Sequence, residues 1–264
     1  MKALVFLGGG RITSALVAGL RRANDPCKIV VYDRNASKLR ALQRESEVEI
    51  VPTLSSALSK ADMAIVAVRP ASVRQLLAQV AACEACPALW VSLAAGIPLK
   101  VLRTQLRRPA VWVRAMPSPV SRIGHGLSAL CFHRSAGKSD RTRVRNLFTQ
   151  VGEVVEVPED RFDVFTATYS SSHGYHALAS LAAAAKQAGL DPKTALTAAA
   201  HALADGVLYW RESGLSLEEL LHEAATPGGI AAATMKAMEK AGYAEAVSRG
   251  LKAGVAQARR NAKS

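Results

Sequence analysis

The chain alternates short apolar runs with amphipathic stretches from its start to about residue 155, and this alternation restricts the fold more than any other feature. The apolar runs contain few polar positions, which is typical of strands in a parallel sheet that helices cover on both faces. We therefore expect a doubly wound, mostly parallel α/β domain. The predicted strands are residues 3–8, 28–33, 48–51, 63–68, 89–93 and 111–115, with edge strands at 127–132 and 153–157. The predicted helices are residues 12–23, 37–45, 71–82, 99–106 and 139–151.

The character of the sequence changes near Pro158. Beyond this point no segment is predicted to form a strand, and alanine becomes frequent. We expect a dinucleotide-binding domain in residues 1–157 and an all-helical domain in residues 158–264. The alanine-rich stretch 177–185 is apolar around most of its circumference, which predicts burial on most sides, by a second subunit rather than by its own chain.

Helix limits can be predicted in this second half from capping residues. Asp191 followed by Pro192 is typical of an N-cap and a first helical position. The helix that they begin should run to about residue 212 and stop at Gly214. Ser216 and Glu219 have the spacing of a capping box, which predicts a further helix.

The stretch VFLGGGRITSALVAGL, residues 5–20, joins a predicted strand to a predicted helix through three glycines. Gly8 permits the tight turn, and Gly10 lets the backbone approach a pyrophosphate. The helix that begins near Arg11 offers free amide groups and the positive end of its dipole. Thr13 stands where a third glycine is usual, and a small residue can serve there. The pattern predicts a Rossmann-type dinucleotide site with contacts from Gly8, Gly10, Arg11 and Ile12.

The end of the second predicted strand bears on which dinucleotide binds. An acidic residue such as Asp33 usually accepts hydrogen bonds from the ribose of NAD, whereas a neighbouring arginine can pair with the 2′-phosphate of NADP. Arg34, Asn35 and Lys38 together favour a phosphate. We predict NADPH as the cofactor, with NADH as the alternative.

The formal net charge of +13 is distributed over several separate segments. Aromatic residues are few and do not interleave with the basic ones, so a stacking surface for single-stranded nucleic acid is not predicted. The simplest interpretation is solvated helix faces, and the alternative is a positive field that attracts an anionic cofactor. We expect a small-molecule substrate, with neither nucleic acid nor membrane as a partner.

Cysteine usage and hydropathy suggest the cytoplasm. Four cysteines in a chain of 264 residues do not indicate a disulfide scaffold, and no apolar run has the roughly 20 residues that span a bilayer. The first residues do not resemble a signal peptide. Cys83 and Cys86 form a CxxC pair, but a zinc site needs about four ligands and no further ligand pair completes it. We expect no metal, and a redox role for this pair is not favoured.

Four further segments, taken together, resemble the pyrroline-5-carboxylate reductase family. AVRP at 67–70 is similar to the family's Ala-Val-Lys-Pro, and SLAAGIPL at 92–99 to its Ser-hydrophobic-Ala-Ala-Gly-Ile stretch. VRAMPSPVSRIGHGLSAL at 113–130 resembles the family's Arg-Val-Met-Pro-Asn-Thr-Pro region. ATPGG at 225–229 resembles its Pro-Gly-Gly turn. The order and spacing of these pieces match over essentially the whole chain.

The resemblance implies where the cofactor and the second subunit lie. It implies that the nicotinamide end of the cofactor is lined by Ala67, Val68, Arg69, Pro70, Ala94, Ala95 and Gly96. It also implies an all-helical dimerisation domain that interlocks with its twin, so that each active site draws on two subunits of a homodimer or a higher oligomer.

The turn at 226–229 is predicted to begin a helix and to bind an anion. Thr226 suits an N-cap and Pro227 the first helical position, while Gly228 and Gly229 would leave their amides uncovered. Such a helix start would suit a substrate carboxylate. Thr226 is also a candidate catalytic residue. The alternative interpretation is an ordinary capped helix.

The segment YSSSHGY at 169–175 departs from the Ser-Gly-Ser-Gly-Pro-Ala-Tyr of the family. Ser171 and Tyr175 are retained, whereas Tyr169 and His173 bring side chains that could donate protons. An acid near a C=N or C=O group typically contributes 10²–10⁴-fold to the rate. His173 and Tyr169 are therefore candidate acids. The candidate substrate contacts are Ser118, Ser171, Ser172, Tyr175, Gly228 and Gly229.

These features predict an NAD(P)H-dependent reductase of a cyclic imine, either 1-pyrroline-5-carboxylate or a related cyclic imino acid. The alternative is a nucleotide-binding sensor of the same superfamily without turnover, because new side chains at 169–175 could fill the substrate pocket.

Overall fold

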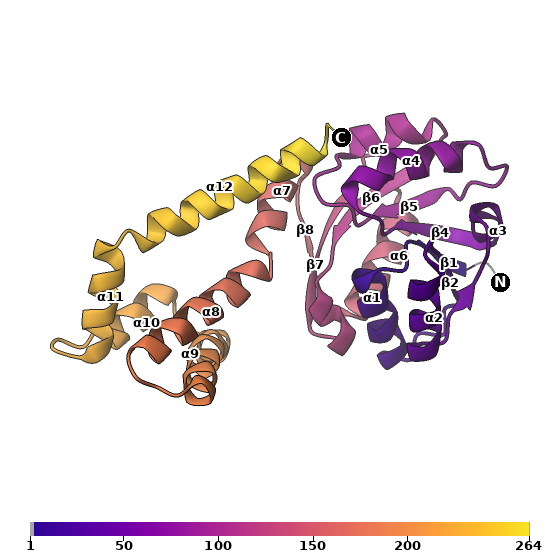
Figure 1. Ribbon diagram of the computed structural model, residues 1–264. Coiled ribbons are helices and arrows are strands. Elements are labelled where there is room, and N and C mark those ends of the chain that lie inside the picture. The colour runs from indigo at the N-terminus through magenta and orange to yellow at the C-terminus, as the bar shows by residue number, and fades with distance from the viewer. Residues whose placement is uncertain (1–2, 264) are drawn as a thin grey trace. The chain divides into compact units, whose positions relative to one another are not determined.

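The computed structural model describes residues 3–263, which form two compact units (Figure 1). The sheet unit comprises residues 3–168 together with 253–263, and the helical unit comprises residues 169–252. This division differs from the predicted boundary between residues 157 and 158. Helix α7 (Glu159–Thr168) and the end of helix α12 (Tyr243–Asn261) group with the sheet by their contacts. The domain limits therefore remain a prediction.

The sheet unit contains one eight-stranded sheet with the order β3-β2-β1-β4-β5-β6-β7-β8. All neighbouring pairs are parallel except β6 with β7, which is antiparallel. The strands are β1 (Ala3–Leu7), β2 (Ile29–Tyr32), β3 (Glu49–Ile50), β4 (Ala61–Val66), β5 (Leu89–Ser92), β6 (Val111–Met116), β7 (Gly126–Phe132) and β8 (Gly152–Glu156). The prediction of a doubly wound, mostly parallel sheet is confirmed.

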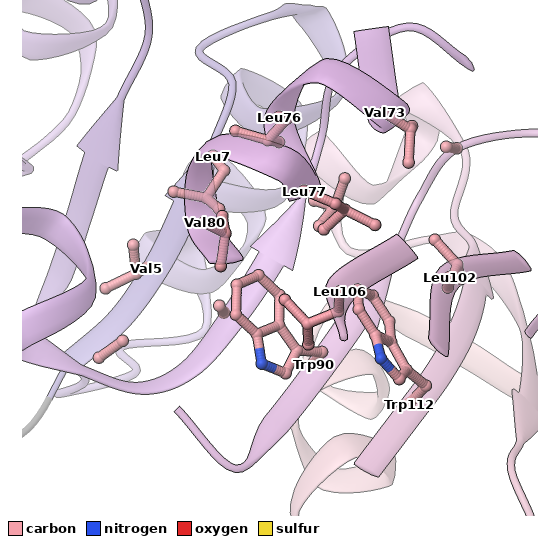
Figure 2. Packing of buried hydrophobic residues seen from close by; sticks show 14 of the residues in the cluster. Val5, Leu7, Val73, Leu76, Leu77, Val80, Trp90, Leu102, Leu106 and Trp112 are labelled. Carbon is pink, nitrogen blue, oxygen red and sulfur yellow. The ribbon is translucent and has the colours of Figure 1, made fainter. Parts of the chain in front are cut away.

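Helices cover both faces of this sheet, and each face has its own apolar core. The helices are α1 (Arg11–Arg22), α2 (Ala36–Glu45), α3 (Leu54–Lys60), α4 (Pro70–Ala81), α5 (Leu99–Leu106), the 3₁₀ helix η1 (Pro119–Ile123), α6 (Lys138–Thr149) and α7. One core joins the sheet to α3, α4, α5 and Phe162 of α7, and the other joins it to α1, α2 and α6. In the first, Trp90 and Trp112 pack with ring centroids 5.3 Å apart (Figure 2).

Helix α3 and the 3₁₀ helix η1 were not predicted. Thr53 begins α3, since its hydroxyl accepts a hydrogen bond from the amide of Ser56 at 3.1 Å. Ser118 begins η1 in the same way, accepting from the amide of Val120 at 3.2 Å. Both segments are short, so their hydrophobic periodicity is too brief to detect, and the capping residue was the available signal.

The helical unit contains α8 (Ser172–Gln187), α9 (Pro192–Ser213), α10 (Leu217–Ala224), α11 (Ile230–Lys240) and the first part of α12. The predicted caps of α9 are confirmed. The Asp191 carboxylate accepts from the amides of Lys193 and Thr194, and Gly214 ends the helix with φ +72°. The capping box of Ser216 and Glu219 is present in full.

The predicted helix start at 226–229 was wrong. Helix α11 begins at Ile230, and its N-cap is Gly229 rather than Thr226. The amide of Gly229 donates to the carbonyl of Thr226 at 2.9 Å, and Gly228 has φ +76°. Residues 226–229 thus form a turn with proline and glycine at its centre, the pairing that a type II turn prefers.

The helical unit has almost no interior of its own. Within residues 169–252, all of which the structure describes, Ala195 and Ala199 are the only buried residues. Helix α8, which carries the alanine-rich stretch 177–185, contains no buried residue in the single chain. Across residues 3–263, no helix combines the length and the apolar character that crossing a membrane requires.

Candidate nucleotide and substrate site

The glycine loop follows β1 at the carboxyl ends of the parallel strands, where the strand order reverses between β1 and β4. Gly8 has φ +121°, and a Cβ there would lie 2.5 Å from the carbonyl oxygen of Ala67. A side chain at this position is therefore excluded by both backbone conformation and space. A Cβ on Gly10 would meet no atom within 4 Å. Gly10 is the N-cap of α1, so the open space lies beside the positive end of that helix.

Thr13 fills the third position of the glycine pattern without disturbing the loop. It is fully buried, and its hydroxyl donates to the carbonyl of Gly8 at 2.6 Å. The departure from glycine thus adds a hydrogen bond between the first turn of α1 and the loop. Close packing of α1 is instead provided by Gly19, where a Cβ would lie 2.1 Å from the carbonyl oxygen of Ser121.

The residues after β2 support the same loop. The Asp33 carboxylate accepts from the amide of Gly9 at 2.8 Å and from the amide of Asn35 at 2.8 Å. Asn35 in turn caps α2 by accepting from the amides of Ser37 and Lys38. Asp33 thus organises the backbone, and Asn35 is committed to the helix start. Arg34 is exposed, and its guanidinium donates to the side chain of Gln75 on α4 at 3.2 Å.

The loops after β4 and β5 lie next to the glycine loop along the sheet edge. Arg69 is the N-cap of α4, with Pro70 at its first position. Ser92 is the last residue of β5, and its hydroxyl accepts from the amide of Ala94 in the following loop at 3.3 Å. Gly96 has φ +77° and is buried. The predicted cofactor segments 8–12, 34–35, 67–70 and 94–96 therefore follow four adjacent strands at one edge of the sheet.

A buried ion cluster that sequence reasoning missed lies beside these loops. Arg114 on β6 is 2% exposed and pairs with Glu159 at 3.1 Å and Asp163 at 2.7 Å. Its guanidinium also lies 4.4 Å from the ring centroid of Phe162. Glu159 further accepts from the amide of Leu99 at the start of α5. The cluster fixes α7 to the sheet, and an arginine inside an apolar strand was the signal for it.

The four cysteines are buried or half-buried free thiols. Cys131 donates to Glu159 at 3.1 Å, and burial, with help from that carboxylate, raises the pKa of Cys131 to about 12. Burial also raises the pKa of Cys86. Thiolate is the reactive form, so neither shift favours reactivity. Among residues 3–263, no group of three or more metal-ligating side chains comes together.

The predicted substrate residues are divided between the two units. Ser118 lies in the sheet unit, nearly buried, with its hydroxyl used as the cap of η1. In the helical unit, the hydroxyls of Ser170 and Ser172 lie 2.8 Å apart at the start of α8. His173 and Tyr175 are exposed in the first turn of that helix. Their roles remain predictions.

The turn at 226–229 presents fewer free amides than predicted. The amide of Gly229 is used within the turn, and the hydroxyl of Thr226 donates to the carbonyl of Glu223 at 3.4 Å. Anion binding at this turn stays a prediction, and the first amides of α11 are the groups left to test for it. Ile230, the first residue of that helix, is 88% exposed.

Comparisons with known proteins cover both units. Residues 3–96 match the family described as NADP oxidoreductase, coenzyme F420-dependent, and residues 159–261 match the family described as pyrroline-5-carboxylate reductase dimerisation. The pyrroline-5-carboxylate reductase of Mycobacterium tuberculosis is 29% identical, and the alignment covers 94% of this chain and 92% of that protein. That of Corynebacterium melassecola is 28% identical, with 92% of each covered.

Solved structures show the same fold. The 1-pyrroline-5-carboxylate reductase of Streptococcus pyogenes superposes with a TM-score of 0.88 at 22% identity, covering 98% of both chains. The NADP-bound pyrroline carboxylate reductase of Plasmodium falciparum has a TM-score of 0.86 at 20% identity, covering 99% of this chain and 98% of the other. A reductive aminase of Aspergillus terreus is more distant, with a TM-score of 0.61 at 18% identity over 86% of this chain and 78% of the other.

The sheet unit thus carries the glycine loop of a dinucleotide-binding protein, and the helical half matches a dimerisation domain named for one enzyme family. Relatives of that name align over nearly the full length of both chains. The chain is similar over nearly its whole length to pyrroline-5-carboxylate reductases, and its helical half matches their dimerisation domain.

Proposed function

We propose that the protein is an NADPH-dependent reductase of a cyclic imine that carries a carboxylate, with 1-pyrroline-5-carboxylate reduced to L-proline as the first reaction to test. The observation that carries the proposal is the full-length alignment with pyrroline-5-carboxylate reductases, over more than nine tenths of both chains. The geometry of the glycine loop agrees with it, because the space in front of Gly10 is open.

The sheet unit would bind the cofactor through its loops. The first amides of α1 and the bare backbone at Gly10 would hold the pyrophosphate. Asp33 already accepts hydrogen bonds from two backbone amides, so it is less available to a ribose hydroxyl. Arg34 and Lys38, beyond the end of β2, would instead pair with a 2′-phosphate. When bound, the dihydronicotinamide supplies the hydride. The role of the chain is then to place the imine carbon about 3–3.5 Å from it.

The helical unit would supply the substrate groups. The first amides of α11 would bind the carboxylate, with Thr226, Gly228 and Gly229 shaping the turn before them. His173 or Tyr169 would give the imine nitrogen its proton, which increases the electrophilicity of the carbon. Ser170 and Ser172 in place of the family's two glycines, and His173 in place of its proline, make this segment more polar, which favours an altered substrate as a second candidate.

The test is to follow NADPH oxidation with pyrroline-5-carboxylate and with a panel of cyclic imines and 2-oxo acids. Turnover with one of the imines supports the proposal and identifies the substrate. Tight NADPH binding with no turnover across the panel would instead support a nucleotide sensor. If turnover occurs, His173→Ala should lower kcat by at least about tenfold, the low end for a general acid. A normal kcat would remove His173 from the mechanism.

We also propose that a second copy of the chain completes the helical unit. Of residues 169–252, all described, only two alanines are buried, so this unit lacks the core that a stable domain requires. Large apolar side chains are exposed instead, and patches of this kind usually mark an interface. The most exposed on α9 and α10 are Leu196, Val207, Leu208, Tyr209, Leu217 and Leu221. The match to a dimerisation family indicates that the partner is the same chain.

The cytoplasm is the proposed location. The four cysteines, Cys27, Cys83, Cys86 and Cys131, are all free thiols, as a reducing compartment would keep them.

A further inference from the structure

The last turns of α12 pack against the loop that follows β5, within the sheet unit. A Cβ on Gly96 would lie 2.2 Å from the carbonyl oxygen of Ala258, so the backbone of α12 occupies the space that a side chain at position 96 would need. Ala258 is buried at this contact. Gly96 also has φ +77°, a conformation that other residues adopt at a cost. The backbone of α12 therefore packs directly against the loop at 94–96 and restricts its conformation.

A chain of side-chain hydrogen bonds strengthens this contact. The Asn261 Nδ2 donates to the carbonyl oxygen of Ala95 at 3.3 Å, and the Asn261 Oδ1 accepts from Gln257 Nε2 at 3.0 Å. Gln257 Oε1 in turn accepts from Arg260 Nε at 3.0 Å and from Arg260 Nη2 at 2.6 Å. The bond from Gln257 fixes which way the Asn261 amide points, so that its NH₂ group faces the loop.

The loop at 94–96 lies where the reactive half of a dinucleotide would reach. Strands β2, β1, β4 and β5 are consecutive neighbours in the sheet. A pyrophosphate at the start of α1, with its adenosine toward the end of β2, leaves the second nucleoside to extend over the ends of β4 and β5. The end of β5 is two strand spacings, about 10 Å, from that of β1. The carbonyl of Ala95 and the backbone of Gly96 stand at that end.

We propose that Asn261 is a positioning residue for the nicotinamide half of the cofactor, acting through the loop at 94–96. This inference rests on the proposed function, since it assumes a nicotinamide cofactor. Asn261 donates a hydrogen bond to the carbonyl of Ala95, and the loop, held in this way, would present a fixed surface to the ring. Asn261 itself does not need to contact the cofactor.

The experiment compares two ligands on purified full-length protein by calorimetry. The first is NADPH, and the second is 2′-phosphoadenosine 5′-diphosphoribose, which lacks only the nicotinamide. In Asn261→Asp the group that faces Ala95 becomes an acceptor, so two oxygens oppose each other. We expect NADPH to bind about tenfold more weakly and the shorter ligand to bind within about twofold of wild type.

Arg259→Gln is the matched control, because it makes the same change in net charge from an exposed position on the same helical turn. It should leave the ratio of the two affinities as in wild type. Gln257→Ala is a second variant, which keeps Asn261 but removes the hydrogen bond to its Oδ1. We expect it to shift the ratio in the same direction by a smaller factor. Thermal unfolding of each variant accompanies the measurement.

Equal weakening of both ligands in Asn261→Asp, or no change in either, would overturn the inference while leaving the proposed function intact. Wild-type protein that binds neither ligand would overturn the proposed function and this inference with it. Selective loss of NADPH in both Asn261→Asp and Gln257→Ala supports the positioning role.

Discussion

The two units of this chain contrast in where their stability comes from. The sheet unit encloses two apolar cores, with Trp90, Trp112 and Phe6 fully buried. The helical unit has regular, well-capped helices but buries only Ala195 and Ala199. Capping and helix propensity can define where helices begin and end, but they contribute little without packing. Secondary structure in the helical unit is therefore specified locally, whereas the proposed second copy of the chain would supply the packing that stabilises it.

The largest expected effect sharpens this contrast in the sheet unit. Trp90→Ala removes a fully buried side chain from the core shown in Figure 2, which should cost about 3–5 kcal/mol of unfolding free energy. The loss relative to wild type should be the same at low and high protein concentration, because the core lies within one chain. Urea unfolding at two concentrations measures it. A loss below about 1 kcal/mol would show that this core contributes less than its burial indicates.

The glycine loop provides a second, intermediate effect. Gly8→Ala forces a side chain at φ +121° against the Ala67 carbonyl, so stability should fall by about 1–3 kcal/mol and NADPH binding should be lost. Gly10→Ala is the matched control, with φ −85° and open space around the new methyl group. Its stability should change by less than about 0.5 kcal/mol, while NADPH binding weakens because the methyl group faces the pyrophosphate. Equal destabilisation by the two variants would contradict this account.

The exposed apolar side chains of α9 test the need for a partner. Leu208 is 58% exposed in the single chain, and Leu208→Asp should weaken a dimer by at least about tenfold. Analytical ultracentrifugation measures the dissociation constant. Lys193→Asp, at an exposed position near the start of the same helix, should change it little. A wild-type protein that remains monomeric at all concentrations would show that the helical unit is stable without a second copy of the chain.

The smallest expected effect concerns the cap of α9. Hydrogen bonds from Thr194 and Lys193 lower the pKa of Asp191 below its ordinary value. A lowered pKa in the folded state means that the cap stabilises the helix above the unfolded pKa, about 3.9, and loses that effect as the pH falls through the folded value. Helical circular dichroism should therefore decline from about pH 4 downward.

Asp191→Asn provides the control for this pH dependence. Asparagine is also a good N-cap but does not titrate, so the variant should lose less helical signal on acidification than wild type does. Trp210 lies on α9, so both proteins are compared in a Trp210→Phe background, in which tryptophan fluorescence comes from Trp90 and Trp112 and reports on the sheet unit. Identical acid profiles for the two proteins would show that Asp191 does not contribute to acid sensitivity.

Most of the sheet unit could be predicted from its sequence because its signals are local. Each strand is a short apolar run, and the glycine loop has a fixed place between β1 and α1. The caps at Asp191, Gly214 and Ser216 were equally readable, since each acts within a few residues of its own position. The predicted helix start at 226–229 was wrong because Thr-Pro-Gly-Gly suits both a capped helix start and a type II turn. The path of the folded chain decided for the turn.

The contacts around the candidate site depend on residues that are far apart in the sequence. Arg114 and Glu159 meet across 45 positions, and Asn261 reaches Ala95 across 166. Nothing in the local pattern of either partner specifies the other, because a side chain's hydrogen-bonding capacity does not encode where its partner will lie. These pairs became visible only when the strands, α7 and α12 were placed together in the sheet unit.

The sequence by itself determined the doubly wound sheet, the glycine loop, most helix limits and the family resemblance, because apolar periodicity, glycine and capping residues act over short distances. Only the tertiary structure decided that Thr13 bonds to Gly8, that Asp33 supports the loop backbone, and that α12 packs against Gly96. The physical reason is that hydrogen bonds and close packing are satisfied in three dimensions, and the folded chain determines which of many eligible partners each group meets.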